Sequence, residues 1–272
     1  MKSKTASYPY IIWMILFIVI PMALVVFFAF TDQSGAFTLQ NISTVGRYSN
    51  VFVRSIWLGA IATVISLVLG YPLAYIIAQT TERRQNVMIM LVMLPMWMNF
   101  LLRTYAWMTL LEDNGLINNA LASIGLGRIH MINTQGAVVL GMIYNYIPFM
   151  ILPIYSVLTK IDPSIIEAAQ DLGANQKRVF TRVIFPMSIP GVISGITMVF
   201  VPAVSTFIIS KMLGGGSNLL IGDLIDMQFL GSAYNPNLGS AISLVLMVLI
   251  LICMGIMNQF DDGENENGGL MI

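Results

Sequence analysis

Six apolar runs, each long enough to cross a lipid bilayer, constrain this chain more than any other feature. A helix needs about 20 apolar residues to cross a hydrocarbon core about 30 Å thick. The runs occupy residues 10–30, 56–79, 87–111, 136–158, 183–210 and 239–257. Backbone polar groups inside a bilayer must find partners within the chain. The sequence therefore predicts an all-α integral membrane protein with six transmembrane helices.

The composition supports this prediction and excludes several classes of function. Of the 272 residues, 57% are hydrophobic and 10% are charged, whereas a soluble domain has about 25% charged residues. Thirteen Lys and Arg balance thirteen Asp and Glu, so the net charge favours no nucleic-acid partner. Cys253 has no second cysteine to pair with, and His130 has no second metal ligand nearby, so no disulfide or metal site is predicted. The first run is too long for the core of a cleaved signal peptide and is expected to remain as a span.

The basic residues predict the orientation, because cytoplasmic loops carry more Lys and Arg than external ones. If the N-terminus is cytoplasmic, eight basic residues lie inside and five lie outside or near the outer membrane edge. The inside residues are Lys2, Lys4, Arg83, Arg84, Lys160, Lys177, Arg178 and Arg182, and the outside residues are Arg47, Arg54, Arg103, Arg128 and Lys211. Both termini are therefore expected in the cytoplasm, with residues 31–55, 112–135 and 211–238 as external loops.

The chain is expected to form one membrane domain with three parts. Residues 1–55 hold the N-terminal transmembrane helix and an external loop, residues 56–257 form the transmembrane core, and residues 258–272 are an acidic cytoplasmic tail expected to lack regular structure. The core includes a cytoplasmic loop at 160–186. In the last external loop, an amphipathic segment at 219–229 is expected to dip into the membrane or to pack across an outer vestibule.

The cytoplasmic loop ends in the polar stretch EAAQDLGANQKRVFTRVIFP at 167–186. Asp162 and Pro163 are typical of a helix start, because Asp accepts hydrogen bonds from free backbone N–H groups and Pro suits the first helical position. Gly173 suits the left-handed residue that ends a helix. We therefore predict a short helix over 162–173, a glycine bend, and a second, basic helix that begins near Asn175 and leads into the fifth span.

Such a short helix is marginal in water unless it packs against something. One face is predicted to be apolar, and its residues are Ile165, Ile166, Ala169 and Leu172. The residues alone leave two alternatives open: the helix packs on the cytoplasmic ends of the chain's own spans, or it docks into a groove on a partner.

The spacing within this loop resembles the EAA loop of bacterial type I ABC importer permeases. That pattern is Glu-Ala-Ala, three residues, Gly, nine residues, an aliphatic residue, one residue, an apolar residue and Pro. The matching positions are Glu167, Ala168, Ala169, Gly173, Val183, Phe185 and Pro186. Val183 and Phe185 replace the more usual Ile and Leu. The position between the fourth and fifth of six spans is also that of the family.

The resemblance implies the transmembrane domain of a type I importer, with a coupling helix at about 162–173 seated in a cleft of a cytoplasmic ATPase subunit. Closure of the ATPase would rock the spans between inward-facing and outward-facing arrangements. The expected coupling residues are Glu167, Ala168, Ala169, Asp171 and Gly173. The sequence has no G-x-x-x-x-G-K-[ST] motif, so the chain is expected to be a transport subunit without enzymatic activity or a cofactor. ATP and Mg are expected in a partner subunit.

Longer stretches, at 69–78, 94–111, 144–174 and 212–229, resemble the permeases of spermidine/putrescine importers. The resemblance implies transport of polyamines across a bacterial plasma membrane. It also implies a homologous second permease subunit, two cytoplasmic ATPase subunits and an extracellular polyamine-binding protein, in addition to membrane lipids. Permeases for sulfate, iron and other small solutes share the architecture, so another solute is the alternative. A stand-alone secondary transporter is less expected, because the spans contain no clear mid-membrane Asp or Glu.

Polar aromatic, amide and hydroxyl side chains in the spans are candidates for a translocation path. Aromatic faces attract ammonium groups by about 0.5–2 kcal/mol, and amide and hydroxyl oxygens can replace lost water. The candidates are Trp97, Asn99, Tyr144, Asn145, Tyr146 and Ser205, the last one turn from Pro202 in a span also interrupted by Pro190. For any single tyrosine, anchoring at the membrane interface is the competing interpretation.

Three charged residues have open roles. Arg103 lies in the third run, where a cation is costly unless it is paired. A structural or gating pair, with Glu112, Asp113 or a carboxylate of a partner chain, is favoured over substrate contact, because Arg103 would repel a polyamine. Asp223 and Asp226 in the last external loop could attract a cation or bind a delivery protein, but a solvated face is slightly favoured.

Overall fold

The computed structural model describes the backbone of residues 8–216, 218–231 and 233–268, and the side chains in these ranges as far as Met257. Within this part of the chain, five helices are long and apolar enough to cross a membrane. A sixth span is present if the bent pair Glu82–Trp97 and Phe100–Ser123 counts as one. The predicted all-α class is confirmed, and the predicted number of spans holds if the bent pair is included.

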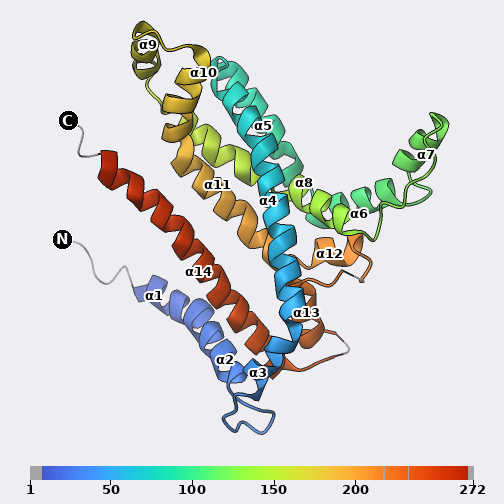
Figure 1. The fold of residues 1–272 in the computed structure, drawn as a ribbon. Coiled ribbons are helices and arrows are strands. Elements are labelled where there is room, and N and C mark those ends of the chain that lie inside the picture. Colours follow the sequence, from blue (N-terminus) through green and yellow to red (C-terminus); the bar gives the residue numbers. More distant parts are fainter. Residues whose placement is uncertain (1–7, 217, 232, 269–272) are drawn as a thin grey trace.

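The first half of the chain runs from α1 to α7. The N-terminal span comprises α1 (Tyr8–Met14), the π-helical η2 (Ile15–Val19) and α2 (Ile20–Ala29). After a loop come α3 (Gln40–Val45), η3 (Gly46–Tyr48), α4 (Ser49–Ala78), α5 (Glu82–Trp97), α6 (Phe100–Leu111) and α7 (Leu116–Ser123). Figure 1 shows α4 running the length of the molecule, from α3 at one end to the turn before α5 at the other.

The second half runs from α8 to α14. Its elements are α8 (Gln135–Leu158), α9 (Pro163–Asp171), α10 (Gln176–Val179), η4 (Phe180–Ile184), α11 (Phe185–Ser205), α12 (Ile208–Leu213), α13 (Ile221–Phe229) and α14 (Pro236–Gly268). The predicted end of the fifth run, 183–210, is wrong. The backbone of Thr206 is extended, so α11 ends at Ser205 and the chain turns into α12. The tail segment 258–268 was expected to lack regular structure, but it continues α14. Residues 269–272 of the predicted tail lie outside the described residues.

Helices α4, α8 and α11 form the centre of the bundle (Figure 1). Close contact between α8 and α11 depends on the small residues Gly191 and Gly195 of α11, which are four positions apart and lie on one face. A Cβ atom at Gly191 would lie 2.9 Å from the Pro153 carbonyl oxygen and 3.0 Å from Ile154 Cα. The two backbones therefore touch at this point, which a larger residue would prevent.

The third predicted run, 87–111, is not one straight helix. It breaks after Trp97, and the segments on either side meet at 87°. Met98 and Asn99 are extended at the break, and Asn99 Oδ1 accepts hydrogen bonds from the N–H groups of Leu101 and Leu102 at 2.9 and 3.3 Å. Asn99 thus supplies the first N–H groups of α6 with an acceptor and begins a new helix in a new direction.

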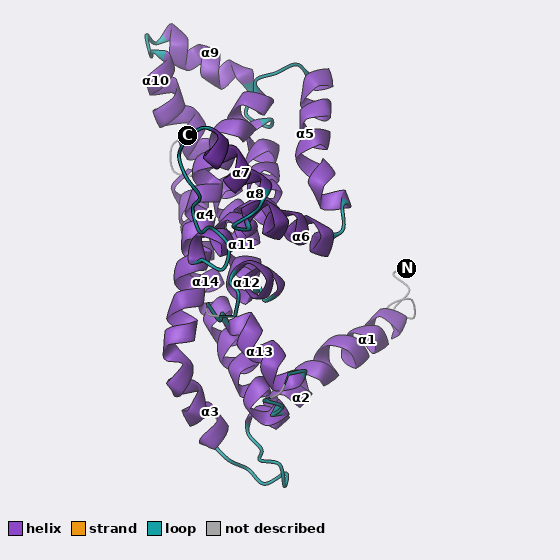
Figure 2. Ribbon diagram, turned by 90° about the vertical axis from the view of Figure 1, so that its right-hand side faces the viewer, coloured by secondary structure: helices purple, strands orange, loops and turns teal. Residues whose placement is uncertain are grey.

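Two elements lie at the edge of the bundle. None of the described side chains of α1, η2 or α5 is buried, and in Figure 2 α5 stands apart from the central helices while α1 points away from them.

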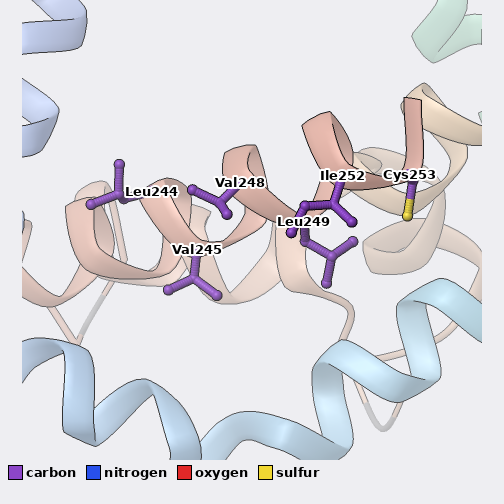
Figure 3. Close-up of a pocket in the computed structure, with 6 residues that line it drawn as sticks. All are labelled: Leu244, Val245, Val248, Leu249, Ile252 and Cys253. Atoms are coloured by element: carbon purple, nitrogen blue, oxygen red, sulfur yellow. The ribbon is translucent and has the colours of Figure 1, made fainter. Parts of the chain in front are cut away.

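A further apolar surface lies along α14 (Figure 3). It is a hollow of about 400 Å³ lined by Leu244, Val245, Val248, Leu249, Ile252 and Cys253. This lining has no charged or hydrogen-bonding side chain apart from the thiol, so it suits lipid or a packed helix and not a hydrated solute.

Candidate functional site

Helix α9 begins and ends as its sequence predicts. Asp162 Oδ1 accepts a hydrogen bond from the Ser164 N–H at 2.9 Å, and this bond holds the pKa of Asp162 below its usual range. Gly173 has φ +81°, its N–H donates to the Gln170 carbonyl at 2.8 Å, and the Ala174 N–H donates to the Ala169 carbonyl at 3.1 Å. This pair of bonds is the Schellman arrangement, which closes a helix at a left-handed residue.

The apolar residues of α9 do not share one environment. Ile166 and Ala169 pack against the buried cluster formed by α4, α8 and α11. Ile165 is 41% exposed and Leu172 is 90% exposed, so only part of the predicted apolar face packs on the chain's own spans, and these two residues remain uncovered. Glu167, Ala168 and Asp171 are exposed, as are Gly173 and its surroundings. Two residues of the loop thus pack inward, and an acidic and apolar surface faces outward. The exposed residues of this outward surface, called the α9 surface below, are Ile165, Glu167, Ala168, Asp171 and Leu172.

The segment after the bend is joined to α4 by aromatic contacts. Asn175 Oδ1 accepts from the Arg178 N–H at 2.9 Å and starts α10, which confirms the predicted second helix. The ring of Phe180 in η4 lies 5.9 Å from that of Tyr71 and 5.2 Å from that of Tyr75. Tyr71 also approaches Phe185, at 5.6 Å. Both approaches to Phe180 are edge-on, the arrangement that aromatic pairs favour.

A large hollow lies between α8 and α11. Its volume is about 960 Å³, and it is lined by Tyr146, Phe149, Leu152, Pro153, Ser156, Val157, Gly191, Ser194, Met198 and Pro202. These residues are called the α8–α11 groove below. None of them is charged, and the polar groups they supply are two hydroxyls and one phenol. Such a lining offers weak contacts spread along a path, without a strong ion-binding point.

The structure brings only one predicted path residue, Tyr146, into this groove. Asn145 is buried, and its Nδ2 donates to the Gly141 carbonyl at 2.9 Å while its Oδ1 has no hydrogen-bond partner. The ring of Tyr144 lies 5.3 Å from that of Trp107. Ser205 Oγ donates to the Val201 carbonyl at 3.0 Å, not to the Met198 carbonyl that Pro202 leaves without its helical donor.

The remaining path candidates, Trp97 and Asn99, lie at the bend between α5 and α6, not in the groove. Trp97 is 71% exposed. Asn99 is exposed and uses its side-chain oxygen to cap α6.

Arg103 is buried on α6, with 7% of its surface exposed. Its Nε and Nη1 have no hydrogen-bond partner, and no ion pair to Arg103 occurs among the described residues. The guanidinium carbon lies 5.9 Å from the centre of the Phe100 ring. The predicted pair with Glu112 or Asp113 is absent, because Asp113 contacts His130 Nδ1 at 2.9 Å and both Glu112 and Asp113 are exposed.

The two aspartates of the last external loop occupy different environments. Asp226 pairs with Lys211 Nζ at 3.1 Å. Asp223 is only 5% exposed, its Oδ2 accepts from the Leu220 N–H at 2.8 Å, and burial raises its pKa. The expectation of a solvated face is therefore wrong for Asp223, because α13 packs against α14 and α11 instead of facing water. Within the described ranges, no group of three His, Cys, Asp or Glu could hold a metal ion.

Sequence reasoning missed the polar and aromatic groups that tie the helices together near α9. Besides Tyr75 and Phe180, these are Gln85, Tyr155 and the buried pair of Tyr71 Oη and Ser188 Oγ, 2.8 Å apart. Gln85 stands in a basic loop and looks like a solvated residue. The sequence has no local signal for these contacts, because Gln85 and Tyr155 are 70 residues apart, and Tyr71 and Ser188 are 117 residues apart.

Residues 70–263 match the family described as "Binding-protein-dependent transport system inner membrane component". The chain belongs to this family of permease subunits of ABC importers, and its apolar helices make it a multi-pass membrane protein. Among its relatives, the spermidine/putrescine transport system permease protein PotB of Haemophilus influenzae is 37% identical over 250 residues, covering 88% of this chain and 87% of the relative. PotB of Escherichia coli is 35% identical over 248 residues, covering 88% and 90%.

Solved structures show the same fold. The crystal structure of a bacterial ABC transporter involved in the import of the acidic polysaccharide alginate matches with a TM-score of 0.76 and 21% identity, covering 94% of this chain and 93% of the other. An inward-facing structure of the MetNI methionine ABC transporter matches with a TM-score of 0.62 and 15% identity, covering 80% and 96%. The fold is therefore that of a type I ABC importer transmembrane domain, as the loop spacing predicted.

Proposed function

We propose that this chain is half of the translocation path of a bacterial polyamine importer, driven by ATPase subunits in other chains. The observation that carries the proposal is the α9 surface: a capped helix with exposed Leu172 and Glu167, at the end of a loop with the spacing of importer permeases. Exposed Ile165 and Leu172 lie beside Glu167 and Asp171 on this surface, a combination of apolar and acidic groups that suits a partner's cleft. The partner ATPase subunit would bind ATP and Mg, and this chain would have no cofactor of its own.

The α8–α11 groove supports an assembly with a homologous second permease subunit. The lining of the groove comes from two helices, α8 and α11, so we take it as one wall of a path that a second subunit completes. Two ATPase subunits would then pair with the two permease subunits. An extracellular polyamine-binding protein would deliver the solute; a related alginate transporter was solved in complex with a periplasmic protein bound to an alginate pentasaccharide.

The chemistry of the groove is compatible with a polyamine. Tyr146 and Phe149 offer aromatic faces to ammonium groups, and the hydroxyls of Ser156 and Ser194 can replace water. The names of the PotB relatives supply the substrate class. The main alternative is another small solute, such as sulfate or iron, because the groove has no charged group that selects a cation.

Competition between solutes tests the substrate class. We expect excess unlabelled spermidine or putrescine to reduce uptake of radiolabelled spermidine by the reconstituted transporter at least about tenfold, whereas excess sulfate leaves it unchanged. Labelled sulfate taken up in an ATP-dependent way, with no spermidine uptake, would support the alternative.

We further propose that both termini and α9 lie in the cytoplasm. The excess of basic residues near α9 and the turn between α4 and α5 supports this orientation. A Cys253→Ala chain with Glu167→Cys should react with a membrane-impermeant maleimide in inside-out vesicles and not in intact spheroplasts. Labelling from outside the spheroplasts would reverse the orientation.

For Arg103 we propose a carboxylate of the second permease subunit as partner. A buried guanidinium with two unpartnered nitrogen atoms is costly, and the described residues supply no anion. We expect Arg103→Gln to weaken assembly of the two permease subunits, measured by co-purification at rising salt, while Arg103→Lys retains part of it. Unchanged assembly with a changed affinity for spermidine would instead favour substrate contact.

A further inference from the structure

At the end of α5 next to α9, one side chain makes hydrogen bonds to two other helices. No side chain of α5 is fully buried, and its packing consists of partly buried residues, Met88, Ile89 and Val92, against the central cluster. Gln85, in the first turn of α5, is half-buried and makes three hydrogen bonds. Its Nε2 donates to the Ala78 carbonyl at 3.0 Å and to the Thr80 carbonyl at 2.9 Å. Its Oε1 accepts from the Tyr155 hydroxyl at 3.0 Å.

These bonds join three helices through groups that would otherwise lack partners. Ala78 is the last residue of α4, and the final carbonyls of a helix have no N–H within that helix. Tyr155 lies in the last turn of α8, and the chain passes from α8 to α9 through residues 159–162 only. The Gln85 side chain therefore connects the end of α4 and the start of α5 directly to the segment that carries α9.

Direct packing between α9 and α4 is incomplete at this place. A hollow of about 330 Å³ separates Pro163 and Ile166 of α9 from Tyr75 and Gln79 of α4, and Gln85 lies in its lining. Without a hydrogen-bonded connection across this hollow, α9 could move into the empty space without moving the residues on its other side. On the other flank, the rings of Phe180 and Tyr75 already join η4 to α4. The bonds of Gln85 supply the corresponding link on the α8 flank.

We infer that Gln85 is a positioning residue, which with Tyr155 transmits movement of α9 to the start of α5. This inference rests on the proposed function, because it requires an ATPase that moves α9. Helix α4 packs tightly against α8 and moves with it in either case. With the link intact, the start of α5 moves with these helices when α9 moves. Without it, the start of α5 lags behind, and ATP is hydrolysed with less transport.

The test measures spermidine taken up per ATP hydrolysed by the complete transporter in proteoliposomes, with the second permease, the ATPase subunits and the binding protein present. Gln85→Met keeps the length of the side chain and removes the amide, and Tyr155→Phe removes only the hydroxyl. We expect each to lower this ratio about 3- to 10-fold, the size of the one hydrogen bond between Tyr155 and Gln85 that both variants remove. The double variant should be no worse than the worse single one, because both remove the same link.

Gln79→Met is the matched control, because Gln79 is exposed at the end of α4, lines the same hollow and makes no side-chain hydrogen bond within the described residues. Its ratio should equal that of the wild type. The inference is overturned if both single variants keep the wild-type ratio, if Gln79→Met lowers it equally, or if uptake and ATP hydrolysis fall in parallel with the thermal stability. Absence of ATP-dependent spermidine uptake by the wild type would overturn the proposed function itself, and this inference with it.

Discussion

Replacing Glu167 by Lys should abolish ATP-driven uptake and leave insertion of the permease in the membrane unchanged. Glu167 is exposed on α9 and makes no hydrogen bond or ion pair within the described part of the chain, so reversing its charge removes no contact inside the subunit. Changes at such surface positions usually alter stability by about 0.5 kcal/mol or less. In a partner's cleft, the reversed charge would be buried without its partner, at a cost of about 2–5 kcal/mol.

Uptake of labelled spermidine and co-purification of the ATPase subunits would be measured together. Glu82→Lys is the matched control, because Glu82 is an exposed glutamate at the start of α5, outside the α9 surface. Normal uptake by Glu167→Lys would exclude the assigned coupling role.

Gly173→Pro should also abolish uptake, by another route. Proline cannot adopt the φ of +81° found at Gly173 and lacks the N–H that Gly173 donates to Gln170.

Replacing Ser194 by Trp should block transport from within the α8–α11 groove. Ser194 is exposed on α11 and lines this hollow of about 960 Å³. An indole placed there fills space that the proposed path needs and that the second permease must approach. We expect uptake to fall at least about tenfold, which corresponds to a cost of about 1.4 kcal/mol for the steps that need this space.

Val68→Trp tests whether the added bulk alone is harmful. Val68 is 64% exposed on α4 and is not part of the groove, so its substitution should leave uptake close to that of the wild type. Membrane content and co-purification of the second permease would be compared for both variants. Equal uptake by Ser194→Trp and Val68→Trp would show that the groove is not the path.

Local signals in the sequence predicted the helices and the bend of the cytoplasmic loop well. The start and end of α9 depend on Asp162 and Gly173, and each acts through hydrogen bonds to residues within a few positions along the chain. The exposure of Leu172 was not predictable in the same way. In the helical repeat, Leu172 lies on the same face as residues that are packed. Which part of that face is covered depends on the surrounding helices.

Features that depend on distant segments could not be predicted from one sequence. The 87° bend near Asn99 was hidden in a continuous apolar run, because proline and asparagine also occur within straight spans. Asp223 was expected in water because it lies in a predicted external loop, but α13 packs against other helices. Gln85 follows two arginines in a stretch predicted as a loop, and its bonds to α4 and α8 depend on how those helices cross.

The central claim is that an ATPase in another chain drives these spans through α9. Its most direct test is uptake of labelled spermidine into proteoliposomes that contain either this chain alone or the chain with the second permease, the ATPase subunits and the binding protein. The account predicts uptake only by the complete assembly and only with hydrolysable ATP. Uptake by this chain alone, driven by an ion gradient without ATP, would contradict it and identify a secondary transporter.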